Sequence, residues 1–284
     1  MSLAFFVSIQ PLWADSNRHE RASPSVIAAT AELLESSGMS EQLQSLPTAV
    51  IASFEQSIRS GGLDLPFVEQ DIPYLKSTLS SAFNSERLQH AVQEQLYAEL
   101  DEQQLGNLLR FYRSAPGREI REAEISNSIL LHRERFTLWH QSSGLRSLTE
   151  ARQLAIQALE RALQASEAAV DTLISMQVAL QLGLTPALPV EQRRSARQLI
   201  DTAQAQRPVL TRAYQESSLE TIAFLYQQQS LDTLRAFTDI LETDAGQRYV
   251  QAVNRGLSHG MLDAAETLGK SMQSLLIRRL GQGV

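Results

Sequence analysis

The chain contains no cysteine among its 284 residues, which excludes disulfide bonds, thiol nucleophiles and cysteine metal ligands. Glycine and proline are scarce, with 13 and 9 residues, and no run of alternating β-branched and polar residues is typical of a strand. The abundant Ala, Leu, Gln, Glu and Arg residues instead favour long helices. The composition therefore predicts an all-α protein.

Concentrated positive charge is also absent. The formal net charge is -7 at pH 7 and the pI is ≈ 5.3, whereas a general nucleic-acid binder needs clustered Lys and Arg to neutralise phosphates. After the N-terminal segment, no apolar run is long enough to cross a bilayer. We therefore expect no nucleic-acid partner and no transmembrane segment in the mature chain.

Motifs that carry catalytic or metal chemistry are missing. The chain has no Gly-x-Ser-x-Gly elbow, no Walker-type Gly-x-x-x-x-Gly-Lys-Ser/Thr loop, no EF-hand loop and no His-Glu-x-x-His pair. Glu119, Glu122 and Glu124 lie close together along one predicted helix. Arg118 and Arg121 supply local partners, which is typical of a solvated helix face. The sequence therefore predicts no catalytic residue, no metal site and no cofactor.

The most informative stretch runs from Leu100 to Gly117. Leu105, Leu108 and Tyr112 follow the helical period and form one apolar stripe. Asp101 precedes this stripe and is a suitable N-cap, because its side chain can accept from the free N–H groups of the first turn. The stretch predicts a short amphipathic helix that ends in a sharp corner.

The corner itself lies in Ser114-Ala115-Pro116-Gly117. Proline disfavours helical geometry in the residue before it, so the first helix should end near Ser114, and Pro116 suits the first turn of the next helix. Gly117 has no side chain, so another backbone can approach closely there. Gly256 and Gly260, late in the chain, likewise suit the close approach of a neighbouring helix.

A diverged copy of this stretch runs from Leu231 to Gly246, and aligning Gly117 with Gly246 requires a shift of 129 residues (246 minus 117). Thr243 or Asp244 then supplies the helix cap that Ser114 supplies in the first copy. We therefore predict a helical bundle built from two tandem related units. The structural corner residues are Ser114, Pro116, Gly117, Thr243 and Gly246.

The first corner resembles a bacterial family catalogued as domain of unknown function 2059. The resemblance is carried by Leu105, Leu108, Phe111, Tyr112, Ser114, Pro116 and Gly117. It is clear from Leu88 to Ala123 and weak in the second copy, where Ile240-Leu241 replaces the Phe-Tyr pair. Members are typically small, helical, exported proteins of Gram-negative bacteria without an established activity. The resemblance implies helical architecture and export, and it brings no catalytic residues.

The N-terminal segment from Leu3 to Ala14 is apolar and ends in a small residue before Asp15. This pattern is typical of the end of a secretory signal peptide, although the basic residues that normally open such a peptide are missing. The alternative is a segment that packs on the body of the protein. We expect residues 1–22 to be a signal-peptide remnant and a loose N-terminus, with the mature protein in the periplasm.

Ser142-Ser143-Gly144 separates two helical blocks and predicts the boundary between a first unit, residues 23–141, and a second, diverged unit, residues 146–284. In the first unit, we expect a kink or break at Pro47 and one long helix from the corner to about Gln141. In the second unit, we expect helices over 151–182, 190–206, 208–228 and 245–280, with Pro208 starting the third of them.

The candidate ligand-binding residues are four aromatic side chains, Phe111, Tyr112, Phe136 and Trp139. Aromatic residues on neighbouring helices can line a pocket between helices, and a filled core is the alternative. These features favour a non-catalytic periplasmic protein that binds a partner protein of the envelope or an apolar small molecule. Two other functions stay open: an envelope hydrolase with a Glu/His site, and a structural protein that lies on a membrane surface through amphipathic helices and Arg278-Arg279.

Overall fold

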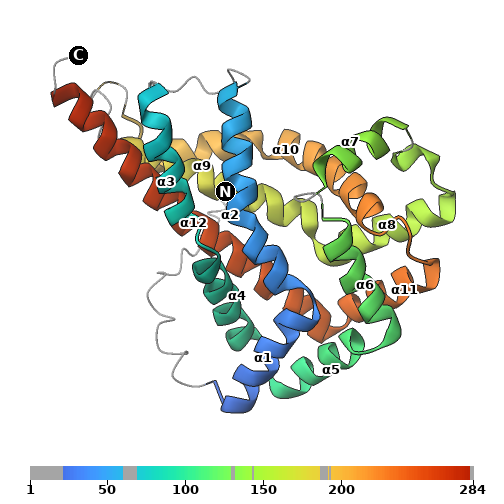
Figure 1. Ribbon diagram of the computed structural model, residues 1–284. Coiled ribbons are helices and arrows are strands. Elements are labelled where there is room, and N and C mark those ends of the chain that lie inside the picture. The colour runs from blue at the N-terminus through green and yellow to red at the C-terminus, as the bar shows by residue number, and fades with distance from the viewer. Residues whose placement is uncertain are drawn as a thin grey trace, which may run out of the picture.

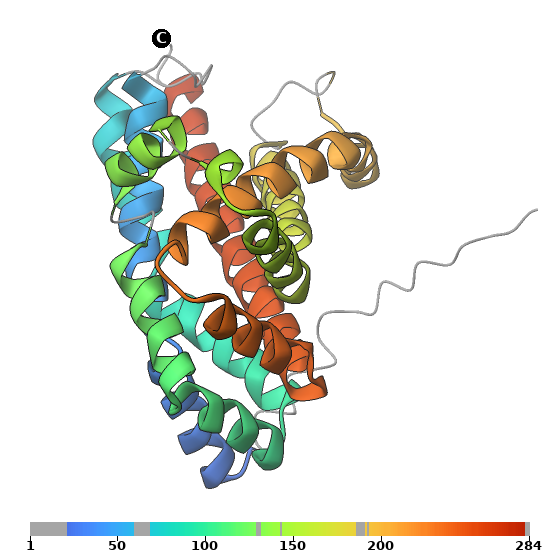
Figure 2. The same cartoon turned by 90° about the vertical axis from the view of Figure 1, so that its right-hand side faces the viewer.

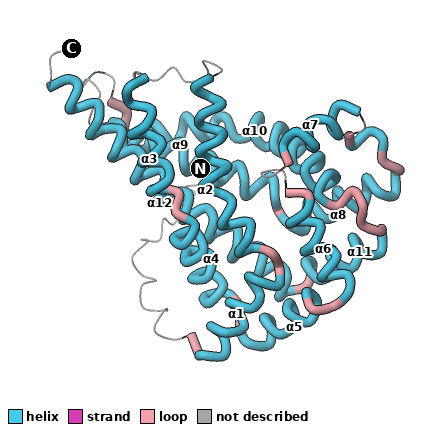
Figure 3. The backbone as a smooth tube through the Cα atoms, in the orientation of Figure 1, coloured by secondary structure: helices cyan, strands magenta, loops and turns pink. Residues whose placement is uncertain are grey.

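The computed structural model describes residues 22–59, 69–128, 132–142, 144–185, 191 and 193–281. These residues form helices and loops and contain no strand, so the predicted all-α class is confirmed (Figure 3). The proposed signal-peptide remnant lies outside the described residues. No helix in the described ranges combines the length and the apolar run that a bilayer crossing requires.

Figure 1 shows the helices in their order along the chain. They are α1 (Pro24–Ser36), α2 (Met39–Arg59), α3 (Ile72–Ala82), α4 (Ser85–Glu99), α5 (Glu102–Tyr112), α6 (Ala115–Ser126), α7 (Arg133–Ser142), α8 (Glu150–Leu163), α9 (Ala165–Leu184), α10 (Ala196–Leu225), α11 (Leu231–Glu242) and α12 (Asp244–Gly281). Two 3₁₀ turns, Glu69–Asp71 and Leu145–Ser147, precede α3 and α8.

Helix α12 runs the length of the molecule and packs against α9, α4 and α3 (Figure 2). Glycines make these contacts close. A Cβ atom at Gly256 would lie 2.5 Å from the Cα of Val92 in α4, and one at Gly183 in α9 would lie 2.8 Å from the Cα of Gly269. Gly260 also faces α4. The predicted close approach of a neighbouring helix at Gly256 and Gly260 is therefore confirmed.

The first corner is built by local hydrogen bonds. The Asp101 side chain accepts from the N–H of Gln104 at 2.8 Å and so caps α5. At the other end, Ser114 Oγ donates to the Phe111 carbonyl at 2.6 Å and accepts from the N–H of Gly117 at 3.4 Å, which caps α6. A Cβ atom at Gly117 would lie 2.1 Å from the Phe111 carbonyl oxygen. The turn is so tight that only glycine fits.

The second corner has the same local geometry. Thr243 Oγ1 donates to the Ile240 carbonyl at 2.6 Å and accepts from the N–H of Gly246 at 3.1 Å. A Cβ atom at Gly246 would again lie 2.1 Å from a carbonyl oxygen, that of Ile240, and 2.6 Å from the Cα of Leu241. Of the two predicted cap residues, Thr243 rather than Asp244 therefore makes the hydrogen bonds that Ser114 makes in the first corner.

The predicted long helix from the first corner to Gln141 is wrong. Helix α6 ends at Ser126, and α7 begins at Arg133. The Asn127 side chain ends α6 by bonding across the molecule, because its Nδ2 donates to the carbonyl of Leu225 at 2.8 Å. Arg135 in α7 donates back to Asn127 Oδ1 at 3.3 Å. Contacts distant in sequence therefore set this break.

The second unit also departs from the predicted helix boundaries. The helix expected over 151–182 is broken at Gln164, whose φ of 51° is left-handed. The carboxylate of buried Glu160 accepts from the N–H and the hydroxyl of Ser166 and stabilises this break. The prediction that a separate helix starts at Pro208 is wrong, because α10 continues through this residue. In the first unit, no break occurs at Pro47, which lies inside α2.

One large hydrophobic core takes side chains from both sides of the Ser142–Gly144 segment, including Leu33, Leu88, Leu105, Ile156 and Phe237. Helix α11 packs on both α6 and α8, and α12 packs on α4. Burial of such side chains stabilises the fold by about 1.5–3 kcal/mol each. The two halves of the chain therefore share a common interior.

Candidate functional site

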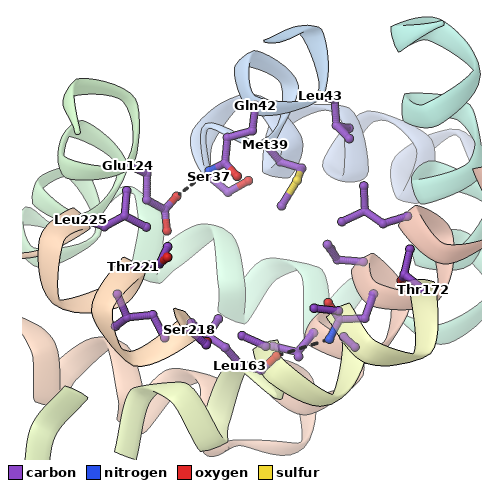
Figure 4. A pocket seen from close by; sticks show the side chains of 18 of the residues that line it. Ser37, Met39, Gln42, Leu43, Glu124, Leu163, Thr172, Ser218, Thr221 and Leu225 are labelled. Atoms are coloured by element: carbon purple, nitrogen blue, oxygen red, sulfur yellow. Dashed lines mark hydrogen bonds between the residues drawn. The ribbon is translucent and has the colours of Figure 1, made fainter. Parts of the chain in front are cut away.

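A cavity of about 780 Å³ lies between α2, α6, α9, α10 and α12 (Figure 4). Its wall is mostly apolar and includes Met39, Leu43, Leu46, Leu173, Val253 and Leu257. Its size falls within the range of roughly 300–1,000 Å³ that is common for small-molecule sites. The space is partly open to solvent, which gives a small molecule a way in.

One carboxyl group, that of Glu124 in α6, faces the cavity. Its Oε1 accepts from the hydroxyl of Tyr226 at 2.5 Å, and its Oε2 accepts from the Nε2 of Gln42 in α2 at 3.2 Å. Burial raises the pKa of Glu124 from its ordinary value of 4.5 to about 7, and the two hydrogen bonds oppose that rise. Glu124 is partly accessible and borders the cavity.

Three buried tyrosines surround this carboxyl group: Tyr112 at the end of α5, Tyr226 after α10 and Tyr249 in α12. The rings of Tyr112 and Tyr249 lie 6.5 Å apart. Burial raises the pKa of Tyr112 and Tyr226 well above the ordinary value of 10.0 and that of Tyr249 to about 12. All three hydroxyls therefore remain protonated and can donate hydrogen bonds at neutral pH.

The position of Tyr226 is fixed by the end of α10. The guanidinium of Arg152 in α8 donates to the carbonyls of Tyr226 and Gln229. The Asn127 side chain, which follows Glu124 by three residues, binds the carbonyl of Leu225. These bonds hold the end of α10 against α6 and place the Tyr226 hydroxyl opposite Glu124.

The described residues of the cavity wall include an acidic side chain and no basic one. Among the described residues that line the cavity, Glu124 is the only carboxylate, and no Lys, Arg or His is present. The other polar groups are hydroxyls and amides, such as those of Ser218, Thr221 and Asn254. Figure 4 shows Glu124, Thr221 and Ser218 on one side of the space and Thr172 on the other.

Comparison with family models, curated proteins and solved structures gives no match. The resemblance of the first corner to the family of domain of unknown function 2059 therefore stays a prediction. The function proposed below therefore depends on the residues of the cavity.

The structure does not bring the four predicted aromatic residues together. Tyr112 lines the cavity, and Phe111, Phe136 and Trp139 do not. Phe111 stacks on Phe237 at 5.8 Å between ring centroids. The other two pack on Phe224 at 5.3 and 5.6 Å, in a separate cluster. Three of the four residues thus contribute to ring packing, and one belongs to the candidate site.

The prediction that Glu119, Glu122 and Glu124 form one solvated face is wrong for Glu124. Arg121, expected to pair within its own helix, instead binds Glu41 of α2 at 2.6 Å. The sequence of α6 does indicate that Glu124 faces the interior. Glu124 lies four residues after the buried Ile120 and seven after the buried Gly117, on the apolar stripe of α6. A carboxylate on such a stripe indicates a buried, partnered group.

None of the described histidines lines the cavity. The His140 Nδ1 lies 2.7 Å from Glu220 Oε2, and half of the His140 side chain is exposed. Neither residue lines the cavity. In the described part of the chain, no group of three or more His, Asp or Glu side chains could hold a metal ion. The cavity offers hydrogen bonding and apolar contact.

Proposed function

We propose that the protein binds a small, largely apolar molecule in the cavity between α2, α6, α9, α10 and α12. One observation carries this proposal: a space of about 780 Å³ has an apolar wall, and its described lining residues include a single carboxyl group. Sites of this kind gain affinity from apolar contact and orientation from a few polar groups. Glu124, Tyr226 and Gln42 are the polar groups that would orient the ligand.

The surroundings of Glu124 support a binding role rather than catalysis. A hydrolase with a Glu/His site needs the two side chains in contact in a cleft. The carboxyl group with the raised pKa instead contacts Tyr226 and Gln42, and the His140–Glu220 contact lies on the surface. These positions favour the non-catalytic function that the sequence predicts.

Arg278, which the membrane-surface alternative would use, has contacts within the protein although it is exposed. The guanidinium of Arg278 lies over the ring of Tyr74 at 5.4 Å, and its Nε donates to the Ser274 carbonyl at 3.2 Å. This side chain is thus engaged within the protein. An envelope protein as the partner stays a prediction, as does the periplasmic location, which depends on residues 3–14.

The two corners support a further part of the proposal, namely that residues 23–141 and 146–284 are tandem related units. Ser114 and Gly117 in the first corner have the same hydrogen bonds and the same backbone clearance as Thr243 and Gly246 in the second. On this proposal the cavity lies between elements of both units, with Glu124 contributed by the first.

Filling the cavity tests the binding function. Ala169 in α9 lines the space, and Ala169→Phe would place a ring in it. Ala205→Phe is the matched control, because Ala205 is exposed on α10. The probe is N-phenylnaphthylamine, an uncharged dye whose fluorescence rises in apolar surroundings.

We expect the fluorescence of the dye to rise with the wild type and with Ala205→Phe, because both bind it. With Ala169→Phe most of this rise should be lost. Circular dichroism and thermal melts verify that both variants are folded. Equal dye binding by the two variants, or no binding by the wild type, would contradict the proposal.

A further inference from the structure

The cavity can compensate a positive charge but not a negative one. Glu124 supplies the only carboxylate of the described lining, and no cationic side chain accompanies it. Taking a charge out of water is costly unless an opposite charge meets it inside. An anionic ligand would find no cation in the wall and would face a like charge at Glu124.

The carboxylate also has unused hydrogen-bonding capacity. An ionised carboxylate offers about four acceptor positions. Among the described residues, Oε1 accepts from Tyr226 and Oε2 from Gln42, one donor each. Both donors come from the protein wall, so positions remain for an N–H donor that enters from the cavity.

Aromatic rings strengthen the preference for positive charge. Tyr112, Tyr226 and Tyr249 gather around Glu124, and Tyr214 of α10 also lines the space. The faces of aromatic rings carry partial negative charge and attract ammonium groups within about 6 Å. A cation placed over one of these rings would therefore gain attraction in addition to that of the carboxylate.

We propose that the cavity selects protonated apolar amines, with the ammonium group at the Glu124 carboxylate and the hydrocarbon part against the Leu, Met and Val wall. This inference depends on the proposed function, since it names the ligand class of the same site. An alcohol of equal length would keep the apolar contact and lose the charge pairing. A fatty acid would add repulsion from Glu124.

Ligand binding is coupled to a proton. The pKa of Glu124 is about 7 in the protein, so part of the population is protonated at neutral pH. An ammonium group favours the ionised carboxylate and displaces that proton. The groups that face Glu124 from other helices are Gln42, Tyr112, Tyr226 and Tyr249, and the tyrosines stay neutral. Amine affinity therefore rises with pH through about 7.

Three eight-carbon probes of equal length test the inference by isothermal titration calorimetry at about pH 8, where Glu124 is mostly ionised and octylamine is protonated. They are octylamine, octanol and octanoate. We expect octylamine to bind the wild type about tenfold or more tighter than octanol, with octanoate weakest. Glu124→Gln should bring the affinity for octylamine down to that for octanol or below it, because the ammonium group then has no opposite charge in the described wall. Glu122→Gln, at an exposed position of the same helix, should behave as the wild type.

The outcomes separate the two proposals. Octanol or octanoate binding to the wild type as tightly as octylamine would overturn the amine preference and leave apolar binding intact. Absence of binding by all three probes would overturn both. The wild-type series decides the ligand class on its own, and octanol binding by Glu124→Gln verifies that the cavity of the variant is intact.

Discussion

Glu124→Gln should stabilise the protein above neutral pH and leave its stability almost unchanged below about pH 5. The glutamine is neutral at every pH and has nearly the shape of a protonated glutamate. In the folded protein the pKa of Glu124 is about 7, whereas the ordinary value is 4.5. The folded state therefore binds the proton more tightly, and between these two values the wild type loses stability as pH rises.

The size of the effect follows from the same two pKa values. One pKa unit corresponds to about 1.4 kcal/mol, so the difference between 4.5 and about 7 amounts to roughly 3 kcal/mol. This loss is complete above pH 7 or so and absent near pH 4.5. The free-energy difference between Glu124→Gln and the wild type should thus grow from near zero to roughly 3 kcal/mol over this range.

Urea unfolding followed by circular dichroism measures this difference at a series of pH values between about 4.5 and about 9. Glu122→Gln is the control, because Glu122 is exposed on the same helix and should show little pH-dependent difference. A difference between Glu124→Gln and the wild type that does not change with pH would refute the reasoning, since burial of the charged form would then cost nothing.

Gly117→Ala and Gly246→Ala should each destabilise the protein by about 1–3 kcal/mol or more, because the new Cβ atom would lie 2.1 Å from a carbonyl oxygen. Gly106→Ala, inside α5 with no atom within 4 Å of the new Cβ, should instead stabilise it by about 0.5–1 kcal/mol. Chemical unfolding of the three variants checks both signs, and equal effects at all three positions would contradict the tight corner. Tyr226→Phe removes a hydrogen bond that lowers the pKa of Glu124 in the folded protein, so the upper end of the pH range over which stability falls should move upward while the lower end stays in place. An unchanged pH profile would show that the hydroxyl does not influence Glu124.

The corners could be predicted from the sequence because their determinants are local. The Asp101 cap, the apolar stripe that includes Leu105 and the Ser114–Gly117 turn all act within a few residues. Propensity and spacing capture such interactions well. The all-α class followed from composition for the same reason, since it sums many local preferences.

The wrongly predicted boundaries depend on side-chain hydrogen bonds that propensity and spacing do not indicate. Asn127 ends α6 by binding a carbonyl in α10 that lies 98 residues further along the chain. Buried Glu160 stabilises the left-handed Gln164 through Ser166, only six residues after Glu160, so this break is set by a local contact that the helical pattern does not reveal. Pro208 shows the opposite case, because α10 continues through a residue that usually ends a helix. Here tertiary packing overrides local preference.

The candidate site contains one residue that the sequence pattern indicates and several that only the fold brings together. Glu124 could have been singled out, because it lies on the apolar stripe of α6. Its partners could not, because Tyr226 and Gln42 lie 102 and 82 residues away in sequence. Aromatic residues close in sequence were a poor guide for the same reason: Phe136 and Trp139 pack on Phe224, away from the cavity. Only the fold decides which rings share a space.

The packing of α12 on α4 has a consequence for biosynthesis. Arg255 and Glu99, which join the two helices, are 156 residues apart. Helices α1 and α2, which are synthesised earlier, also pack on α4, but the part of α4 that contacts α12 stays uncovered until α12 leaves the ribosome. Exposed apolar surface on nascent chains promotes aggregation and recruits chaperones. The hydrophobic core can therefore be completed only late in synthesis. A chain that terminates before α12 should be degraded or held by chaperones, and should not fold into a partly active protein.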